Sequence, residues 1–382
     1  MQSKSKGAHD SVPMPVVVRP LIERRLQRFC LKHRAAIETV AARHRNLADL
    51  AVSFPGLLFT LAVPRRGLEA DRAINHAMAG ANLATLAQLT ELPLWLRKLP
   101  PEAFVRPIGR LPDGEFFSRQ IANHLPRSPK LMPVWLQTVA QSASSGSEDF
   151  AVWAARQLLK KKLRFKQNRL QLLSLWSWYS LQPEQSTPTR RGGSWRPSIS
   201  YEKAMMSARD WLDDVSLHLN LGDEGISDMW LEAATFDGYD FVPLRTSADI
   251  MTEAQAMKNC LVTYGDWLRT QTCRLWSARK NGERVASISL EISYKDRLLT
   301  IREIKGPENQ KAAGDIAWAA RKWLHSHELI NLDDTRRGRR EVEFNRKAWA
   351  EMWRPYWLAK GRIPQWLPLC PSTEALYELG WS

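Results

Sequence analysis

The sequence predicts an α+β protein, with a helical basic N-terminal half and a C-terminal domain that contains an antiparallel three- to four-stranded meander flanked by helices. Three observations indicate this class. Apolar residues recur at helical intervals before residue 200, three β-like runs lie at about 273–279, 284–292 and 297–304, and helical segments flank these runs. The chain has 382 residues, which exceeds one typical domain, so two are expected.

The N-terminal half begins with a polar leader, residues 1–20, which is expected to be disordered. A helical basic domain should follow at residues 21–182. Apolar residues recur at helical intervals from Leu21 to Leu50, which predicts one basic amphipathic helix. Prolines then break the chain into short helices, because proline removes a backbone donor, and a second long helix is expected from about Glu148 to Leu181.

The charge of the chain is divided unevenly at residue 200. Residues 1–200 contain 30 Lys and Arg against 13 Asp and Glu, whereas residues 201–382 contain 25 against 27. A basic surface attracts polyanions, so we expect the N-terminal half to contact nucleic acid, DNA or RNA. Simple solvation of the helices by Lys and Arg is the alternative. The candidate contact residues are Arg24, Arg25, Arg28, Lys160, Lys161, Lys162, Arg164 and Lys166.

A linker and the α+β domain are expected next. Residues 183–200 combine Pro, Gly, Ser and Thr without apolar periodicity, which is typical of a linker, and the domain should span 201–330. Thr252 and Gln255 are spaced as in a capping box at a helix start. Helices are predicted at 201–220, 252–264 and 310–327, and a strand at Tyr239 to Leu244.

Two dipeptides mark the turns of the predicted meander. Asn281-Gly282 is typical of a tight hairpin turn between the first and second runs. Lys295-Asp296 separates the second run from the third. Short connections of this kind join antiparallel neighbours, so consecutive strands should pair with one another.

Residues 331–382 are expected to form a Trp-rich basic tail. Trp349, Trp353 and Trp357 are spaced at i, i+4 and i+8, which places them on one helical face, although Pro355 would interrupt the turn between them. A large aromatic ring buries much apolar area. We therefore expect these rings to pack against the body of the protein.

Several classes of protein are disfavoured by the composition. The four cysteines are far apart and form no CxxC pair, which argues against a disulfide framework or a zinc ribbon. No apolar run approaches the roughly 18 residues of a membrane span, and no secretory signal is evident, so a cytoplasmic location without membrane contact is expected. Nucleotide-binding glycine loops and metal-ligand spacings are also lacking, so neither a cofactor nor a metal is predicted.

Three segments within residues 241–309 follow an order of motifs that resembles the PcfJ-like family. They read VPLRTSADIMTEAQAMKNCLVTYGDWL, CRLWSARKNGERVASISLEI and LLTIREIKGPENQ. Two positions depart from the family pattern, since Asn259 replaces a His and Glu303 replaces a Gln. The matching positions are Met257, Cys260, Tyr264, Ser277, Arg279, Glu291, Gly306 and Asn309.

The resemblance implies a bacterial protein from a conjugative plasmid, a phage or another mobile genetic element. It supplies no established reaction, so whether the chain is an enzyme stays open. A protein partner encoded by the same element is an expectation of the resemblance.

Cys260 is the first candidate for chemistry. In the predicted 252–264 helix, Met257, Cys260 and Tyr264 would share one face. A nucleophilic Cys needs a neighbouring base or cation, and the amide of Asn259 supplies neither. We therefore favour a small, buried Cys260 in the core, with a catalytic thiol as the alternative.

Charged residues on successive predicted strands form the second candidate. Arg279 would grip a phosphate or carboxylate while Glu303 or Asn309 orients the ligand, and Gly306 would allow a positive φ or close approach to the backbone. A cross-strand ion pair, with Glu291 as the third charged residue, fits equally well. The ligand-binding candidates are Asn259, Arg279, Glu303, Gly306 and Asn309; the catalytic candidates, for an enzyme, are Cys260, Tyr264, Arg279 and Glu303.

Together these patterns favour an accessory protein of a mobile element, whose basic half contacts nucleic acid and whose C-terminal domain binds a ligand or partner. Two alternatives stay open. One is an enzyme of unknown reaction with a pocket at the catalytic candidates, and the other is a structural interaction module.

Overall fold

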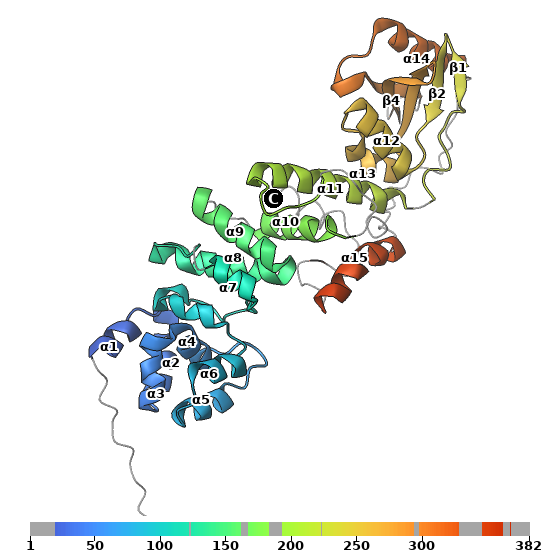
Figure 1. Ribbon diagram of the computed structural model, residues 1–382. Coiled ribbons are helices and arrows are strands. Elements are labelled where there is room, and N and C mark those ends of the chain that lie inside the picture. The colour runs from blue at the N-terminus through green and yellow to red at the C-terminus, as the bar shows by residue number, and fades with distance from the viewer. Residues whose placement is uncertain are drawn as a thin grey trace, which may run out of the picture. The chain divides into compact units, whose positions relative to one another are not determined.

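The computed structural model describes residues 20–121, 124–161, 167–182, 193–222, 224–293, 298–327 and 346–361, and residue 367. The chain divides into two compact units, Met1–Lys166 and Gln167–Ser382. The described part of the first unit is helical, whereas the second combines helices with a five-stranded antiparallel sheet (Figure 1). The α+β class is confirmed. None of the described helices is both long and apolar enough to cross a bilayer.

The first unit is built from short helices, as its many prolines predict. Its α-helices are α1 (Pro20–Leu26), α2 (Leu31–Ala41), α3 (Arg45–Ser53), α4 (Pro55–Ala62), α5 (Ala70–Met78), α6 (Leu83–Leu89), α7 (Glu115–Ile121), α8 (Met132–Ser145) and α9 (Glu148–Lys161). Single 3-10 turns lie at η1 (Leu94–Lys98), η2 (Pro101–Ala103) and η3 (Pro129–Leu131). Helix α4 is buried from Pro55 to Leu61, and it forms the centre of this unit's core.

Three helices, α1 to α3, occupy the segment expected to be one helix, so that prediction is wrong. The turn after α1 buries Phe29, and Arg34 donates a hydrogen bond to the Phe29 carbonyl at 3.1 Å. At the start of α3, His44 Nδ1 accepts from the backbone N–H of Asn46 at 3.2 Å. Each short helix can then direct its own apolar residues, such as Ile37 in α2, into the core.

The second long helix expected in the first half corresponds to α9 (Glu148–Lys161) and α10 (Gln167–Tyr179), and residues 162–166 between them lie outside the described residues. Helix α9 belongs to the first unit, and α10 belongs to the second. The Tyr179 ring stacks on Trp211 at 5.4 Å, and its hydroxyl donates to the Met352 carbonyl at 2.6 Å. The units therefore divide before α10, whereas a linker was expected at 183–200, of which residues 183–192 lie outside the described residues.

The Trp-rich segment forms α15 (Arg346–Lys360), which continues through Pro355. Trp349 and Trp353 are buried, so the expected packing of these two rings is confirmed. Buried aromatic rings from α10, α11 and α15 form one cluster within the second unit. The basic run at 336–340 lies outside the described residues.

The sheet of the second unit is a meander in the order β1-β2-β3-β4-β5. Asn281 and Gly282 both have positive φ, 51° and 82°, as the predicted hairpin turn requires. The Lys295-Asp296 turn lies outside the described residues. The strands are β1 (Ala234–Phe236), β2 (Tyr239–Pro243), β3 (Cys273–Lys280), β4 (Glu283–Ile292) and β5 (Leu299–Lys305), so the short β1 adds a strand beyond the three or four expected.

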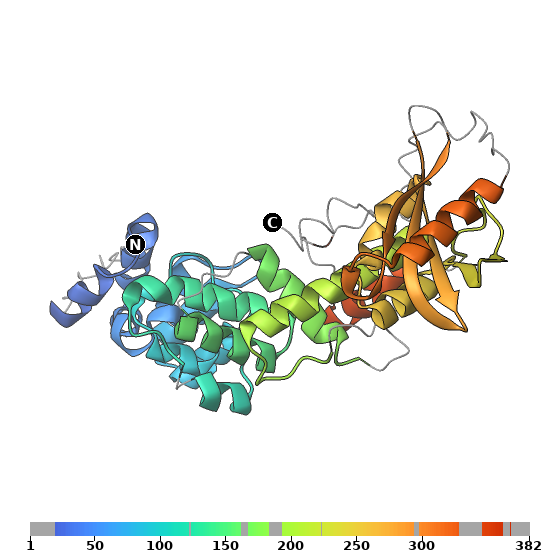
Figure 2. The ribbon, with the colours of Figure 1, turned by 90° about the horizontal axis from the view of Figure 1, so that it is seen from above.

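Helices cover both faces of this sheet (Figure 2). Helix α14 (Gly314–Ser326) packs on one face, where Trp323 stacks on Phe241 at 4.3 Å. The other face is covered by α12 (Ser247–Met257), the 3-10 turn η5 (Leu261–Tyr264) and α13 (Gly265–Arg269), with α11 (Tyr201–Leu221) beyond them. The pairing register shifts once between β3 and β4, at Ala278/Arg279, and once between β4 and β5, at Ser289/Leu290.

Candidate functional site

Helix α12 begins and ends earlier than the expected 252–264 helix. Its capping box is formed by Thr246 and Asp249, whereas Thr252 lies inside the helix, so the expected box is wrong. Lys258 adopts a left-handed conformation with φ 50° and ends the helix. The motif residues after Lys258 therefore lie outside helix α12.

This early end changes the expected arrangement of Met257, Cys260 and Tyr264. Met257 is buried at the end of α12, Cys260 is exposed, and Tyr264 lies in η5, so the three do not share one helix face. The prediction that Cys260 is a buried core residue is also wrong. Its Sγ lies 3.6 Å from the amide oxygen of Asn309. The buried thiol of this region is instead Cys273, whose pKa burial raises to about 11.

Asn259, in the place of the family His, belongs to a buried hydrogen-bond network. Its Nδ2 donates to Ser287 Oγ at 3.0 Å, and Ser287 Oγ donates to Glu253 Oε1 at 3.2 Å. Arg284 Nε donates to the other oxygen of Glu253 at 2.8 Å. The Glu253 side chain is 0% exposed, so these donors offset the cost of burying its charge.

Three cationic residues lie on the same sheet face as this network. Arg279 is paired with Arg284 across β3 and β4, and Ser287 is paired with Lys305 across β4 and β5. Arg279 Nε donates to Ser277 Oγ at 3.3 Å, and Ser277 is itself the cross-strand partner of Ser287. We call Arg279, Arg284, Lys305, Ser277 and Ser287 the cationic row.

Charge in the cationic row is only partly balanced. Glu253 pairs with Arg284, but neither Arg279 nor Lys305 forms an ion pair with any residue that the structure describes. The hydroxyls of Ser277 and Ser287 are buried beside these cations. The Ser287 proton is donated to Glu253, so the groups available to an oxyanion are the N–H groups of Arg279 and Lys305 and the hydroxyl of Ser277.

Tyr264 and Glu303 form a separate contact on this face. The Tyr264 hydroxyl donates to Glu303 Oε2 at 3.2 Å. Burial, and then the negative charge of Glu303, raise the pKa of Tyr264, so the phenol remains a hydrogen-bond donor at neutral pH. Glu303 therefore accepts a hydrogen bond from Tyr264 and forms no ion pair with Arg279. Glu291 lies further along the sheet, where it pairs with Arg302 at 3.6 Å.

The loop after β5 lies beside the end of α12. Lys258 Nζ lies 2.9 Å from Glu308 Oε1 in an exposed ion pair. Gly306 has φ −75°, so the expected positive φ is not found there, and an added Cβ would make only ordinary contacts within the chain. The positive φ values fall on Glu308 and Asn309, at 57° and 59°. Non-glycine residues in this conformation are strained and cluster at functional sites.

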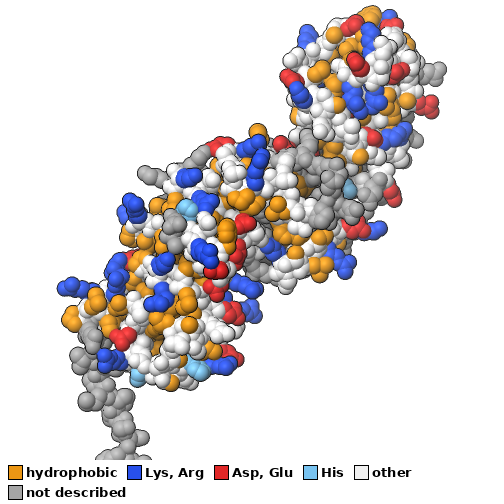
Figure 3. Space-filling model, in the orientation of Figure 1, with side chains coloured by type: hydrophobic (Ala, Val, Ile, Leu, Met, Phe, Trp, Pro, Cys, Tyr) orange, Lys and Arg blue, Asp and Glu red, His pale blue; other side chains and the backbone are white. Residues whose placement is uncertain are grey.

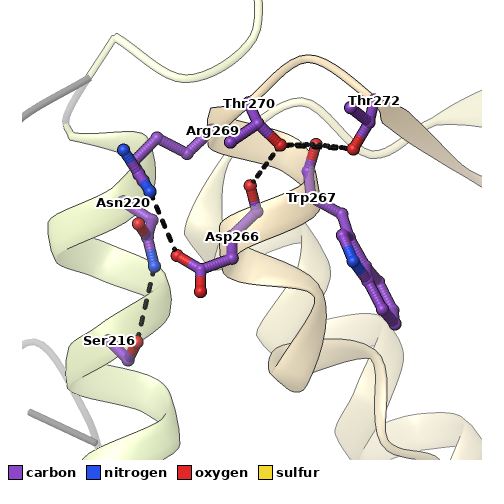
Figure 4. Close-up of polar contacts among 7 residues, drawn as sticks. All are labelled: Ser216, Asn220, Asp266, Trp267, Arg269, Thr270 and Thr272. Atoms are coloured by element: carbon purple, nitrogen blue, oxygen red, sulfur yellow. Dashed lines mark hydrogen bonds and ion pairs between the residues drawn. The ribbon is translucent and has the colours of Figure 1, made fainter. Parts of the chain in front are cut away.

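Helix α13 packs against α11, and Trp267 points away from α11 (Figure 4). An added Cβ at Gly265 would lie 2.7 Å from Asn220 Nδ2, so glycine permits the close approach of the two helices. Trp267 packs edge-to-face on Tyr264 at 4.8 Å, and Arg302 lies 4.0 Å over its ring. Arg269 pairs with Asp266 at 3.4 Å on the other side of α13.

The nucleic-acid candidates lie on two elements of the first unit, α1 with its following turn, and α9. Arg24 is exposed, Arg25 is half-buried, and Arg28 pairs with Glu102. Lys160 is exposed, whereas the side chain of Lys161 and all of Lys162, Arg164 and Lys166 lie outside the described residues. In the view of Figure 3, Lys and Arg side chains are spread among apolar and acidic ones.

Sequence reasoning missed three members of this region: Glu253, Arg284 and Lys305. Glu253 had a detectable signal, because it lies beside Ile250, Ala254 and Met257 on the apolar side of its helix. An acidic residue on an apolar helix face requires a buried partner. A comparison of the chain with protein-family models, curated proteins and solved structures finds no match, so the function of this region is inferred from its geometry.

Proposed function

We propose that the second unit binds a ligand through an anionic group, a phosphate or a carboxylate, at the cationic row. The observation that supports this proposal is the excess of cations there. Neither Arg279 nor Lys305 forms an ion pair with a described residue, although Asp240, which accepts a hydrogen bond from Thr235, is the cross-strand neighbour of Arg279 on β2. The two buried hydroxyls lie on the same sheet face. Like charges on neighbouring strands destabilise a sheet, and a bound oxyanion would relieve that repulsion.

The proposal extends to the class of protein. The motif order at 241–309 supports a PcfJ-like accessory protein of a bacterial mobile element that acts in the cytoplasm. Binding is favoured over nucleophilic catalysis, because the exposed Cys260 contacts an amide, Asn309, and not a base.

Substitution of Arg279 by Lys tests this proposal. Lysine keeps the charge but loses the planar fork that matches an oxyanion, so we expect affinity for inorganic phosphate or acetate to fall about tenfold, roughly 1.4 kcal/mol. Titration calorimetry of the full chain measures this affinity. Arg321→Lys on α14 is the matched control, because Arg321 is exposed on the opposite side of the sheet. Unchanged binding by Arg279→Lys, or equal losses in both variants, would contradict the proposal.

A second function is favoured by the charge of the first unit. We propose that its basic residues contact nucleic acid, since residues 1–166 contain 26 Lys and Arg against 12 Asp and Glu. The full chain should bind a DNA or RNA duplex with an affinity that falls steeply with salt. Replacing Arg24, Arg25 and Lys160 by Gln should reduce the slope of log affinity against log salt concentration by up to about three. A salt dependence unchanged in this variant would exclude these residues as phosphate contacts.

A further inference from the structure

A second candidate site lies in the first unit, apart from the surfaces discussed so far. A cavity of about 640 Å³ opens between α6, the segment 110–114 and the junction of α8 with α9. This volume is within the roughly 300–1,000 Å³ of small-molecule sites. Its apolar residues include Leu92 and Leu111, both nearly fully buried. Its charged residues are Glu91, Arg110, Asp113 and Glu148.

One wall of the cavity is held in place at two points. Trp95 Nε1 donates to the Pro112 carbonyl at 2.9 Å, and Gly114 N–H donates to Glu148 Oε1 at 3.2 Å. A Cβ at Gly114 would lie 2.3 Å from the other oxygen of Glu148. Only glycine therefore permits the carboxylate to lie against this segment. The position of Glu148 at the cavity wall is thus set by backbone contacts.

The residues that line the cavity carry more negative than positive charge, although the first unit as a whole is basic. Glu91 pairs with Arg65. In contrast, Asp113 and Glu148 form no ion pair with any residue in the described ranges. The N-terminus of α9 offsets part of the charge of Glu148, whereas Asp113 is exposed and its carboxylate is hydrated. Arg110 is the single cation among the lining residues.

We propose that this cavity binds a small organic cation, an ammonium group carried on an apolar chain. The ammonium would lie between Asp113 and Glu148, and the chain would cover the buried leucines of the floor. Coulomb attraction to the two carboxylates favours a positively charged ligand. Burial of the ligand's apolar chain stabilises the complex by roughly 25 cal/mol per Å² of apolar surface buried. The site is independent of the cationic row, which lies in the second unit.

Three probes of equal length and different charge test the proposal on the full chain. They are n-hexylammonium, 1-hexanol and hexanoate, and their binding is measured by ligand-observed saturation-transfer NMR with a dissociation constant for each. We expect n-hexylammonium to bind at least about tenfold more tightly than 1-hexanol, and hexanoate to bind most weakly. Equal affinities, or a preference for hexanoate, would overturn the assignment.

The double variant Asp113→Asn and Glu148→Gln locates the binding. The amides keep the shape of the wall and an acceptor for Gly114 N–H, so the fold should persist. Affinity for n-hexylammonium should fall about tenfold, while affinity for 1-hexanol stays the same. Asp71→Asn is the control, because Asp71 is exposed on α5 and does not line the cavity. An undiminished affinity in the double variant, or the same loss in the control, would place the cation elsewhere.

Discussion

The two faces of the sheet are built from alternate residues of the same strands, yet their chemistry differs. The α14 face presents Trp276, Ile288 and Leu290, and Trp323 packs against them. At neighbouring positions of the same strands, the α12 face presents Ser277, Ser287 and the three cations of the cationic row. A sheet that served only as a core would be apolar on both covered faces, because buried polar groups lower stability unless they are paired. The α14 face is apolar along these rows, whereas the α12 face combines an apolar part around Leu275 with the polar row to which we assign the proposed anion site.

Trp323→Ala should have the largest effect and would show that the α14 face holds the unit together. The ring is fully buried against Phe241 and Trp276, and its loss leaves a large cavity. We expect the free energy of unfolding to fall by about 3–5 kcal/mol. Urea denaturation measures this change. A loss below about 1 kcal/mol would show that this face is not the main core.

Glu253→Gln should have an intermediate effect on the opposite face. The change leaves Arg284 without its carboxylate and weakens the acceptor of Ser287. Because Arg284 is 31% exposed and partly hydrated, we expect a loss of about 1–3 kcal/mol in the free energy of unfolding. Glu291→Gln is the control, since its pair with Arg302 is exposed and should contribute at most about 1 kcal/mol. Equal effects of the two variants would show that burial of Glu253 does not matter.

Lowering the pH should destabilise the second unit through Asp315, which lies on α14. The hydrogen bond from Tyr239 at 2.7 Å, and then that from the backbone N–H of Ile316, lower the pKa of Asp315 below its ordinary value of 3.8. A carboxyl with a depressed folded-state pKa stabilises the fold above pH 3.8, and this contribution is lost as the pH falls below that value. Tyr239→Phe should flatten the pH dependence of the unfolding midpoint there. An identical acid profile in this variant would contradict the assigned cause.

Gly306→Ala should have the smallest effect. The residue has φ −75°, and its added Cβ would lie 3.7 Å from the nearest atoms. We expect a change in stability within about 0.5 kcal/mol and no change in phosphate affinity, by the same denaturation and calorimetry. A loss of phosphate affinity alone would show that the ligand approaches the backbone at this residue.

Local patterns in the sequence predicted the meander well, because its signals are short-range. The Asn281-Gly282 turn and the alternation of β4 fix the β3–β4 pairing without reference to distant residues. The end of α12 was misplaced because the stretch up to Tyr264 contains neither Gly nor Pro. Lys258 stops the helix in a left-handed conformation that its residue type does not indicate.

The candidate site was predicted in part. Arg279 was identified from its strand position, but its neighbours Glu253 and Lys305 depend on tertiary pairing. The expected partnership of Arg279 with Glu303 fails because of the strand register. Glu303 pairs with Ser289, whose partner on β3 is Leu275, four residues along the strand from Arg279. The two compact units divide at 166/167, before the linker expected at 183–200. The stacking of Tyr179 on Trp211 and its hydrogen bond to the Met352 carbonyl, which join α10 to the second unit, leave no local signal in the sequence.

The register shift at Ser289/Leu290 has a consequence for association between copies of the chain. Leu290 pairs with Ile301 while Ser289 pairs with Glu303, so Arg302 is an extra residue in β5. Arg302 and Glu303 then both lie on the α12–α13 side, where they contact Trp267 and Tyr264. β5 is an edge strand, and a bulge with adjacent charges is a device that discourages edge-to-edge pairing and aggregation. Lys305 at the end of this edge is already paired with Lys311, and the bulge interrupts the regular backbone pattern that another strand would need along the rest of β5.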